Sequence, residues 1–174
     1  MAAAPTAVDV LLDAFGRIPD LVHDVLDGLA PATLVRQPDL TGRAGNSIGW
    51  LIWHLARMED AQVADLAGAP EVHADGWLKR LGTPYPLDGH GYGQSADEVA
   101  AFTVNSPQVL ADYYAAVHNR TVAVLRAMAL DDLTRVVDDS WDPPVTAMVR
   151  LVSVVDDAAQ HIGQAAYLKG LLVG

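Results

Sequence analysis

The stretch SVVDDAAQHIGQAAYLKG, residues 153–170, decides the fold, because it has the pattern of a buried helix with polar residues among the apolar ones. Its Val, Ala, Ile and Leu residues recur at helical spacing, whereas Asp157 and His161 stand four positions apart. At about 100° per residue, these two side chains project from the same side of a helix, one turn apart. We therefore predict a helix from about Thr146 to Leu172 that presents a carboxylate and an imidazole to one point.

Three further segments show helical periodicity, and no segment alternates like a half-buried strand for more than a few residues. Pro19 is expected to bend or break the first helix, because proline cannot continue the hydrogen-bond ladder. The three helices are expected over 6–29, over 47–68 after a cap at Asn46 or Ser47, and over 107–129 after a cap at Ser106. The pattern predicts an all-α four-helix bundle that forms a single domain, residues 1–174.

The connection between the second and third helices, residues 69–105, is too long for a simple bundle turn. DGWLKRL (75–81) and SADEVAAF (95–102) are expected to form short helices within it. A connection of this length in a four-helix protein predicts a crossover or a functional lid. The aromatic and imidazole side chains that could cover a site are Tyr85, His90, Tyr92 and Trp141.

Composition excludes several classes of function. Eleven Lys and Arg stand against 22 Asp and Glu, and the resulting net charge of −11 repels nucleic acid. The N-terminal residues lack the basic segment of a signal peptide, and no apolar run reaches the length of a membrane span. We therefore expect a soluble protein of the cytoplasm. The chain has no cysteine, so any sulfur chemistry must come with a substrate.

A metal site is the chemical interpretation of the polar pair. His54 lies in the middle of the apolar second helix, and it meets Asp157 and His161 if the second and fourth helices face each other. Two imidazoles and one carboxylate leave coordination positions open, as in catalytic zinc sites and non-haem iron(II) sites. The residues that could support the ligands are Asp156, Gln160 and Gln164.

Other interpretations of these residues remain open at this point. An Asp/His pair at this spacing is common as a surface ion pair, and a histidine in an apolar helix is often a hydrogen-bonded core residue. The histidines that we do not expect to be ligands are His23, His73, His90 and His118.

Two segments, NSIGWLIWHLARMEDAQV (46–63) and VDDAAQHIGQAAYLKGLL (155–172), resemble the signature helices of the DinB-like superfamily. SWDPPV (140–145) and GWLKRLG…GYG are similar to segments of its actinobacterial branch, the mycothiol-dependent S-transferases. The resemblance implies a DinB-like four-helix bundle with a long crossover after the second helix. It also implies a metal triad formed by one histidine of the second helix and a pair from the fourth.

Carried onto this sequence, the triad is His54, Asp157 and His161. Many members have histidine at the position of Asp157, whereas the related mycothiol-dependent maleylpyruvate isomerase has a carboxylate there. The resemblance implies a detoxifying S-transferase that conjugates mycothiol to electrophilic small molecules through a metal-bound thiolate. Zinc is the expected metal, because it binds thiolate without redox chemistry.

The candidate contacts for the thiol are Trp50, one turn before His54, and two basic residues, Arg57 and Arg150. Two rival functions stay open. A metal-dependent hydrolase would activate water and would use Glu59 or Asp156 as a general base. A non-enzymatic bundle would use the same face for binding or dimerisation. Because the Ala- and Val-rich helices carry several apolar faces, we expect a homodimer whichever of these functions the protein has.

Overall fold

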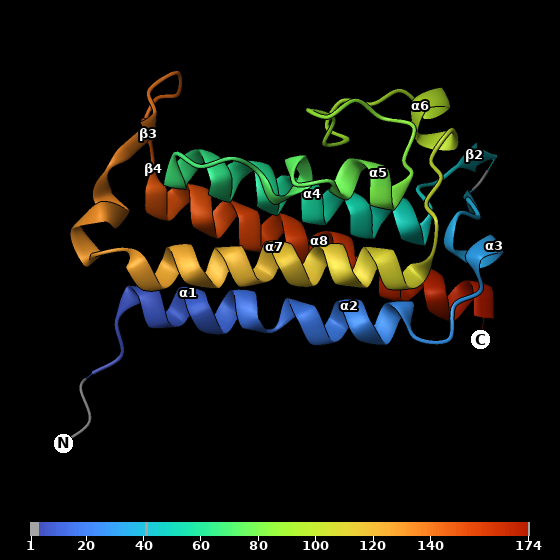
Figure 1. Ribbon diagram of the computed structural model, residues 1–174, viewed down its shortest axis with the longest axis horizontal. Coiled ribbons are helices and arrows are strands. Elements are labelled where there is room, and N and C mark those ends of the chain that lie inside the picture. The colour runs from blue at the N-terminus through green and yellow to red at the C-terminus, as the bar shows by residue number, and fades with distance from the viewer. Residues whose placement is uncertain (1–3, 41, 174) are drawn as a thin grey trace.

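The computed structural model describes residues 4–40 and 42–173 and confirms the all-α bundle (Figure 1). The first rod consists of two helices in line, and the other three rods are single long helices. The α-helices are α1 (Ala7–Gly16), α2 (Ile18–Leu26), α3 (Pro31–Leu34), α4 (Ile48–Ala67), α5 (Trp77–Leu81), α6 (Ala96–Ala100), α7 (Pro107–Ala127) and α8 (Ala147–Val173). That the whole chain, 1–174, forms one domain stays a prediction.

The first rod breaks where the sequence predicts it. The α-helix α1 ends at Gly16, and Pro19 occupies the first turn of α2, where its missing N–H costs no helical hydrogen bond. At the other end of α1, the Thr6 side chain accepts a hydrogen bond from the Asp9 N–H, and the Asp9 carboxylate accepts one from the Thr6 N–H. The single predicted helix over 6–29 is therefore two shorter helices.

Side-chain caps set the ends of the long helices. Ser47 accepts a hydrogen bond from the Trp50 N–H and begins α4, and Gly68 ends it in the left-handed conformation. Ser106 accepts a hydrogen bond from the Val109 N–H and begins α7, with proline at the first helical position. The predicted caps at Ser47 and Ser106 are confirmed.

Helix α8 runs through the centre of the packing, and its most extensive contacts are with α4. Its buried stripe consists of Ala147, Leu151, Val154, Ala158, Ile162, Ala165 and Leu168. Full burial of one Leu or Ile side chain contributes about 1.5–3 kcal/mol, so this stripe holds α8 in a defined orientation. Asp157 and His161 lie at the edge of the stripe, half-buried beside α4.

The described residues also form four short strands and two 3₁₀ turns. Strand β1 (Asp39–Leu40) pairs with β2 (Arg43–Ala44), and β3 (Val136–Asp138) pairs with β4 (Val145–Thr146), both antiparallel. The 3₁₀ turns are η1 (Val72–Ala74) and η2 (Leu130–Thr134). The β3–β4 hairpin leads directly into α8 and lies at the left end of the bundle in Figure 1.

The predicted crossover over 69–105 lies along α4, and α5 and α6 form within it (Figure 1). Arg57 of α4 is fully buried and holds this segment through several hydrogen bonds. Its guanidinium donates to the Gly89 carbonyl at 2.9 Å and to the Glu71 carboxylate at 2.7 Å. It also pairs with Asp60, whose carboxylate accepts hydrogen bonds from two backbone N–H groups of η1. The crossover is therefore fixed to α4, the helix that carries His54.

Among the described helices, none combines the length and the apolar character that crossing a membrane requires.

Candidate metal centre

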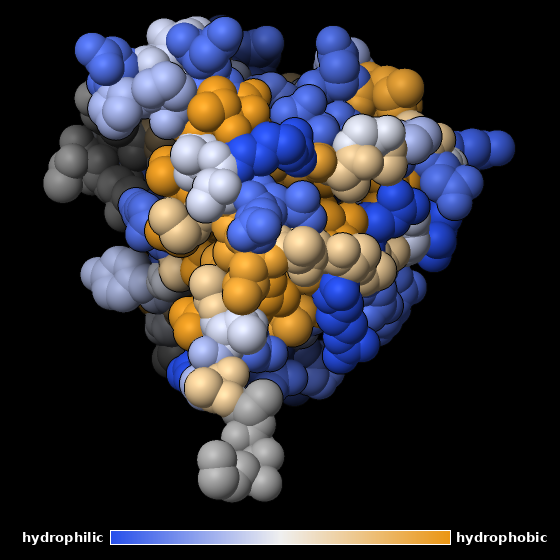
Figure 2. Space-filling model, turned by 90° about the vertical axis from the view of Figure 1, so that its left-hand side faces the viewer, coloured by the Kyte–Doolittle hydropathy of each residue, from blue (hydrophilic) through white to orange (hydrophobic). Residues whose placement is uncertain are grey.

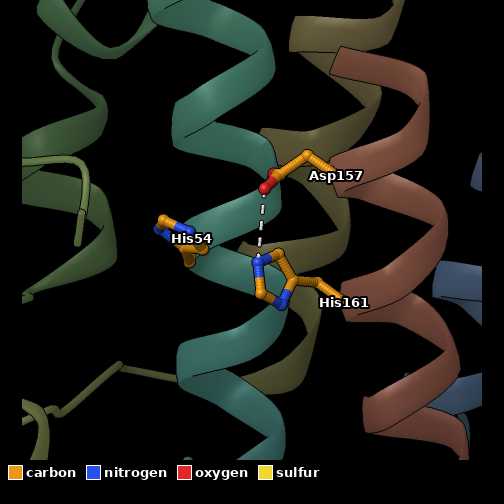
Figure 3. A group of neighbouring side chains, drawn as sticks. All are labelled: His54, Asp157 and His161. Atoms are coloured by element: carbon orange, nitrogen blue, oxygen red, sulfur yellow. Dashed lines mark ion pairs between the residues drawn. The ribbon is translucent and has the colours of Figure 1, made fainter. Parts of the chain in front are cut away.

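The three predicted ligands converge in the structure. His54 projects from α4, and Asp157 and His161 project toward it from α8 (Figure 3). One ligand atom from each residue lies within 4.8 Å of the other two. The rings of His54 and His161 meet edge to face, with centroids 4.8 Å apart. Among the described residues, this is the group that places three such side chains around one point.

The crossover orients His54. The backbone carbonyl of His90 can only accept a hydrogen bond, so the His54 Nδ1 atom next to it carries the proton. The remaining nitrogen, Nε2, is then free to bind a cation. The Trp50 ring stacks on the imidazole at 4.7 Å and is itself held by a hydrogen bond from its Nε1 to Gln94. Burial lowers the pKa of His54, so this imidazole stays neutral at lower pH than an imidazole in water does.

His161 is oriented in the same way from its own helix. Its Nδ1 lies 3.1 Å from the Gln164 side-chain oxygen, and its Nε2 lies 3.4 Å from an Asp157 oxygen. In each histidine, therefore, Nδ1 lies beside a protein oxygen, and in His161 the Nε2 atom faces Asp157. The hydrogen bond to Asp157 raises the pKa of His161, because it favours the charged imidazole.

The carboxylate supplies a test of whether these residues fit a metal ion. One oxygen of Asp157 is buried and has no hydrogen-bond partner, which is costly for a carboxylate. Its second oxygen faces His161. The exposed fractions of the Asp157 and His161 side chains are 31% and 19%, so the site opens to solvent. An imidazole nitrogen from each histidine and a carboxylate oxygen without a hydrogen-bond partner fit a divalent cation with room for a further ligand.

The opposite pKa shifts predict how metal binding depends on pH. A metal binds the neutral imidazole, so it must displace the proton of His161 but none from His54. We expect the affinity for Zn²⁺ to fall about tenfold per pH unit below the raised pKa of His161. Competition titrations against a chelator between pH 5.5 and 8 measure this. In Asp157→Asn the fall should begin at lower pH, and an affinity that does not change with pH would contradict the assignment.

The structure places the other predicted site residues at different distances from the ligands. Gln164 contacts His161, one of the candidate ligands, whereas Gln160 is hydrogen-bonded to Asp156 on the exposed face of α8. Arg57 lies buried beneath the crossover and is therefore not available to a bound thiol. Arg150 lies further along α8 and bonds to Gln62 and Asp138, with 26% of its side chain exposed.

The crossover residues divide into buried and exposed ones. Tyr85 is packed against Trp53 and donates a hydrogen bond to the Glu98 carbonyl, so it anchors the segment. Tyr92 of the crossover is exposed, and so is Trp141, which lies outside it in the β3–β4 hairpin. His90 contributes its backbone carbonyl to the site. The remaining histidines that we expected not to be ligands, His23, His73 and His118, lie outside the triad.

Gly91 is a site residue that the sequence reasoning missed. Its φ angle is +94°, a conformation that L side chains rarely adopt, and a Cβ atom there would lie 2.6 Å from His54 Nδ1. It would also lie 3.1 Å from the ring atoms of Trp50 and Trp53. The signal was present in the three glycines of GHGYG, residues 89–93, because a close backbone approach requires glycine.

Glu59 and Asp156, the candidate bases of a hydrolase, do not belong to the group formed by His54, Asp157 and His161. Glu59 is fully buried and accepts hydrogen bonds from Tyr114 at 3.1 Å and Thr121 at 2.7 Å, both on α7. It lies about 140° around α4 from His54. Asp156 is on the exposed face of α8. This arrangement disfavours the hydrolase.

The buried carboxyl group of Glu59 is expected to make the stability of the fold depend on pH. Burial raises its pKa from 4.5 to about 7, so the folded state binds this proton more tightly than the unfolded chain. Its contribution is complete below about pH 4.5 and is lost as the pH rises to about 7. Relative to Glu59→Gln, the wild type should lose about 3 kcal/mol of unfolding free energy over this interval. Urea denaturation at several pH values measures it, and Asp156→Asn is the exposed control. If the unfolding free energies of the wild type and of Glu59→Gln changed equally with pH, the prediction would be contradicted.

The fold and the site define a class: a four-helix bundle whose helices bring two histidines and one carboxylate together around one point. The sequence model of the mycothiol S-transferase family matches residues 10–174, and the chain belongs to this family. It is therefore an enzyme of the mycothiol S-transferase class, and the resemblance found in the two signature helices is confirmed.

A solved structure of a conserved protein from Enterococcus faecalis is similar over the full length. It is 29% identical and superimposes with a TM-score of 0.88, covering 98% of this chain and 99% of that one. No curated protein sequence matches the chain.

Proposed function

We propose that this protein is a metal-dependent S-transferase that conjugates mycothiol to electrophilic small molecules, with zinc as its metal. The observation that carries the proposal is the convergence of His54, Asp157 and His161, whose ligand atoms lie within 4.8 Å of one another, with Nδ1 of each histidine beside a protein oxygen and one Asp157 oxygen without a hydrogen-bond partner. The family supports transfer of a thiol.

In this proposal His54, Asp157 and His161 are the ligands that hold the cation. When bound, a divalent cation lowers the pKa of a thiol beside it, so that the nucleophilic thiolate forms at neutral pH. Since the chain has no cysteine, the sulfur comes from the cosubstrate. The net reaction forms one carbon–sulfur bond, while the thiol proton is lost with the displaced group or is taken up by the acceptor.

The residues around the candidate ligands have different roles in this proposal. The stacked ring of Trp50 covers one face of His54, and the His90 carbonyl holds the imidazole in the tautomer that leaves Nε2 free. Arg57 keeps the crossover in place and acts only through it. Arg150 is the basic residue that we assign to the polar groups of the thiol, because it is partly exposed on the same helix as two of the ligands.

We further propose that the protein acts as a homodimer in the cytoplasm. Exposed apolar residues at the hairpin end of the bundle support this: Leu130, Val136 and Met148. Figure 2 views this end of the molecule and shows hydrophobic residues gathered there among polar ones. Analytical ultracentrifugation should give twice the chain mass, whereas a single-chain mass at micromolar concentration would rule out the dimer.

The deciding experiment is a thiol-transfer assay with a fluorogenic electrophile. Mycothiol, glutathione and buffer without thiol are compared before chelation, after chelation and after return of zinc. We expect turnover that requires both mycothiol and the metal. Turnover that survives complete chelation would overturn the metal dependence. Absence of transfer in protein shown to carry zinc would overturn the conjugation of such electrophiles.

A further inference from the structure

A pocket of about 330 Å³ lies between the start of α4 and the second half of α8. Its wall is formed by Gly45, Asn46, Leu51, Gln164, Tyr167 and Leu168. This volume is at the lower end of the range for small-molecule sites, and it fits an aromatic ring with a short chain.

The pocket is continuous with the candidate metal centre. Leu51 precedes His54 by three residues on α4, and Gln164 follows His161 by three residues on α8. The start of α4 lies beside the second half of α8, so both steps lead in the same direction, about 5 Å along the helices. Gln164 links the two regions directly, because it lines the pocket and also bonds to His161.

The chemistry of the wall is apolar and uncharged. Leu51 and Leu168 are buried beneath the pocket, and Tyr167 stands beside them with 68% of its surface exposed. The wall contains no Asp, Glu, Lys or Arg side chain, although the chain carries a net charge of −11. In the other direction from the ligands, α8 presents the ion pair of Arg150 with Asp138. The two sides of the candidate centre therefore differ in polarity.

We propose that this pocket binds the uncharged alkyl or aryl part of the electrophile. The inference rests on the proposed S-transferase function and names the class of acceptor. A hydrophilic thiol loses hydrogen bonds to water against Leu51 and Leu168, whereas an apolar group gains from the transfer. The thiol thus lies toward Arg150, and the acceptor approaches it from the side of Tyr167.

Direct binding tests the pocket without any reaction. The probes are unreactive 4-alkylbenzyl alcohols, from methyl to butyl, titrated by ligand-observed NMR into the zinc-loaded full chain. The dissociation constant is expected to fall about fourfold with each methylene that enters the pocket. Tyr167→Ala should raise it about five- to tenfold, since it removes the ring at the rim. Asn46→Phe, which fills the pocket from the opposite wall, should abolish the dependence on chain length.

A matched control lies one turn further along the same helix. Leu171 is exposed but does not line the pocket, so Leu171→Ala should leave every dissociation constant unchanged. Unsaturable binding, or binding that Tyr167→Ala and Asn46→Phe leave unchanged, would overturn the inference.

Kinetics with the matching 4-alkylbenzyl chlorides separate this inference from the proposed function. In that reaction the carbon–sulfur bond forms, chloride leaves with the electron pair of the carbon–chlorine bond, and the thiol proton passes to buffer. Tyr167→Ala should raise KM for the chloride and leave KM for mycothiol unchanged. Binding of the alcohols without any transfer would overturn the proposed function and the acceptor role together, but not the apolar site. Transfer at a rate independent of chain length would overturn this inference alone.

Discussion

Replacing His161 by alanine is expected to lower the affinity for Zn²⁺ by more than about 100-fold and to abolish metal-dependent thiol transfer. Loss of a supporting partner already costs a metal site 10- to 100-fold, and His161 is a proposed ligand itself. The side chain is half-buried at the edge of the α8 stripe, so its removal takes away little core volume. The helical circular dichroism signal should therefore stay close to that of the wild type.

The matched control for this experiment is His23→Ala, which changes an exposed histidine of α2 outside the triad. Zinc content after dialysis and competition titration with a chelator are the measurements. His54→Ala should behave like His161→Ala, although burial of His54 makes some loss of stability expected as well. Full zinc stoichiometry in either variant would refute the assignment of the triad.

Substituting alanine for Gly91 is expected to lower the zinc affinity of the site, although Gly91 lies in the crossover and is not itself a candidate ligand. The new Cβ atom cannot remain 2.6 Å from His54 Nδ1, so either the backbone or the imidazole must move. Movement breaks the hydrogen bond between the His90 carbonyl and His54, and with it the control of the tautomer. We expect the zinc affinity to fall about 10- to 100-fold.

Gly93 supplies a control with the same backbone cost. Its φ angle is +75°, and a Cβ atom there would meet nothing within 4 Å. A non-glycine residue in the left-handed region costs about 1–2 kcal/mol in either position. The difference between Gly91→Ala and Gly93→Ala in zinc affinity and in unfolding free energy thus isolates the contact with His54. Equal effects of the two substitutions would show that the close approach of Gly91 does not matter.

The candidate ligand pair was predictable because it depends on local geometry. Residues four apart on a helix share a face whatever surrounds them, so Asp157 and His161 follow from the spacing alone. The same holds for the caps at Ser47 and Ser106 and for the break before Pro19, each of which rests on hydrogen bonds within a few residues. These features need no knowledge of the tertiary structure.

The role of Arg57 could not be predicted, because its partners lie far away in sequence. From the sequence, Arg57 was a candidate contact for the polar groups of the thiol. The structure buries it and bonds it to Gly89 and Glu71, which belong to the crossover. A buried guanidinium requires several acceptors, and only the folded path of residues 69–105 brings those acceptors together.

The sequence by itself determined the helical architecture, the shared face of Asp157 and His161 on α8 and the absence of any thiol in the chain, because periodicity, capping and composition are local properties. The tertiary structure decided that His54 meets this pair, that the His90 carbonyl orients His54, and that an apolar pocket opens beside the candidate ligands. These features depend on how α4, α8 and the crossover pack together. That packing is set by the shapes of many side chains at once.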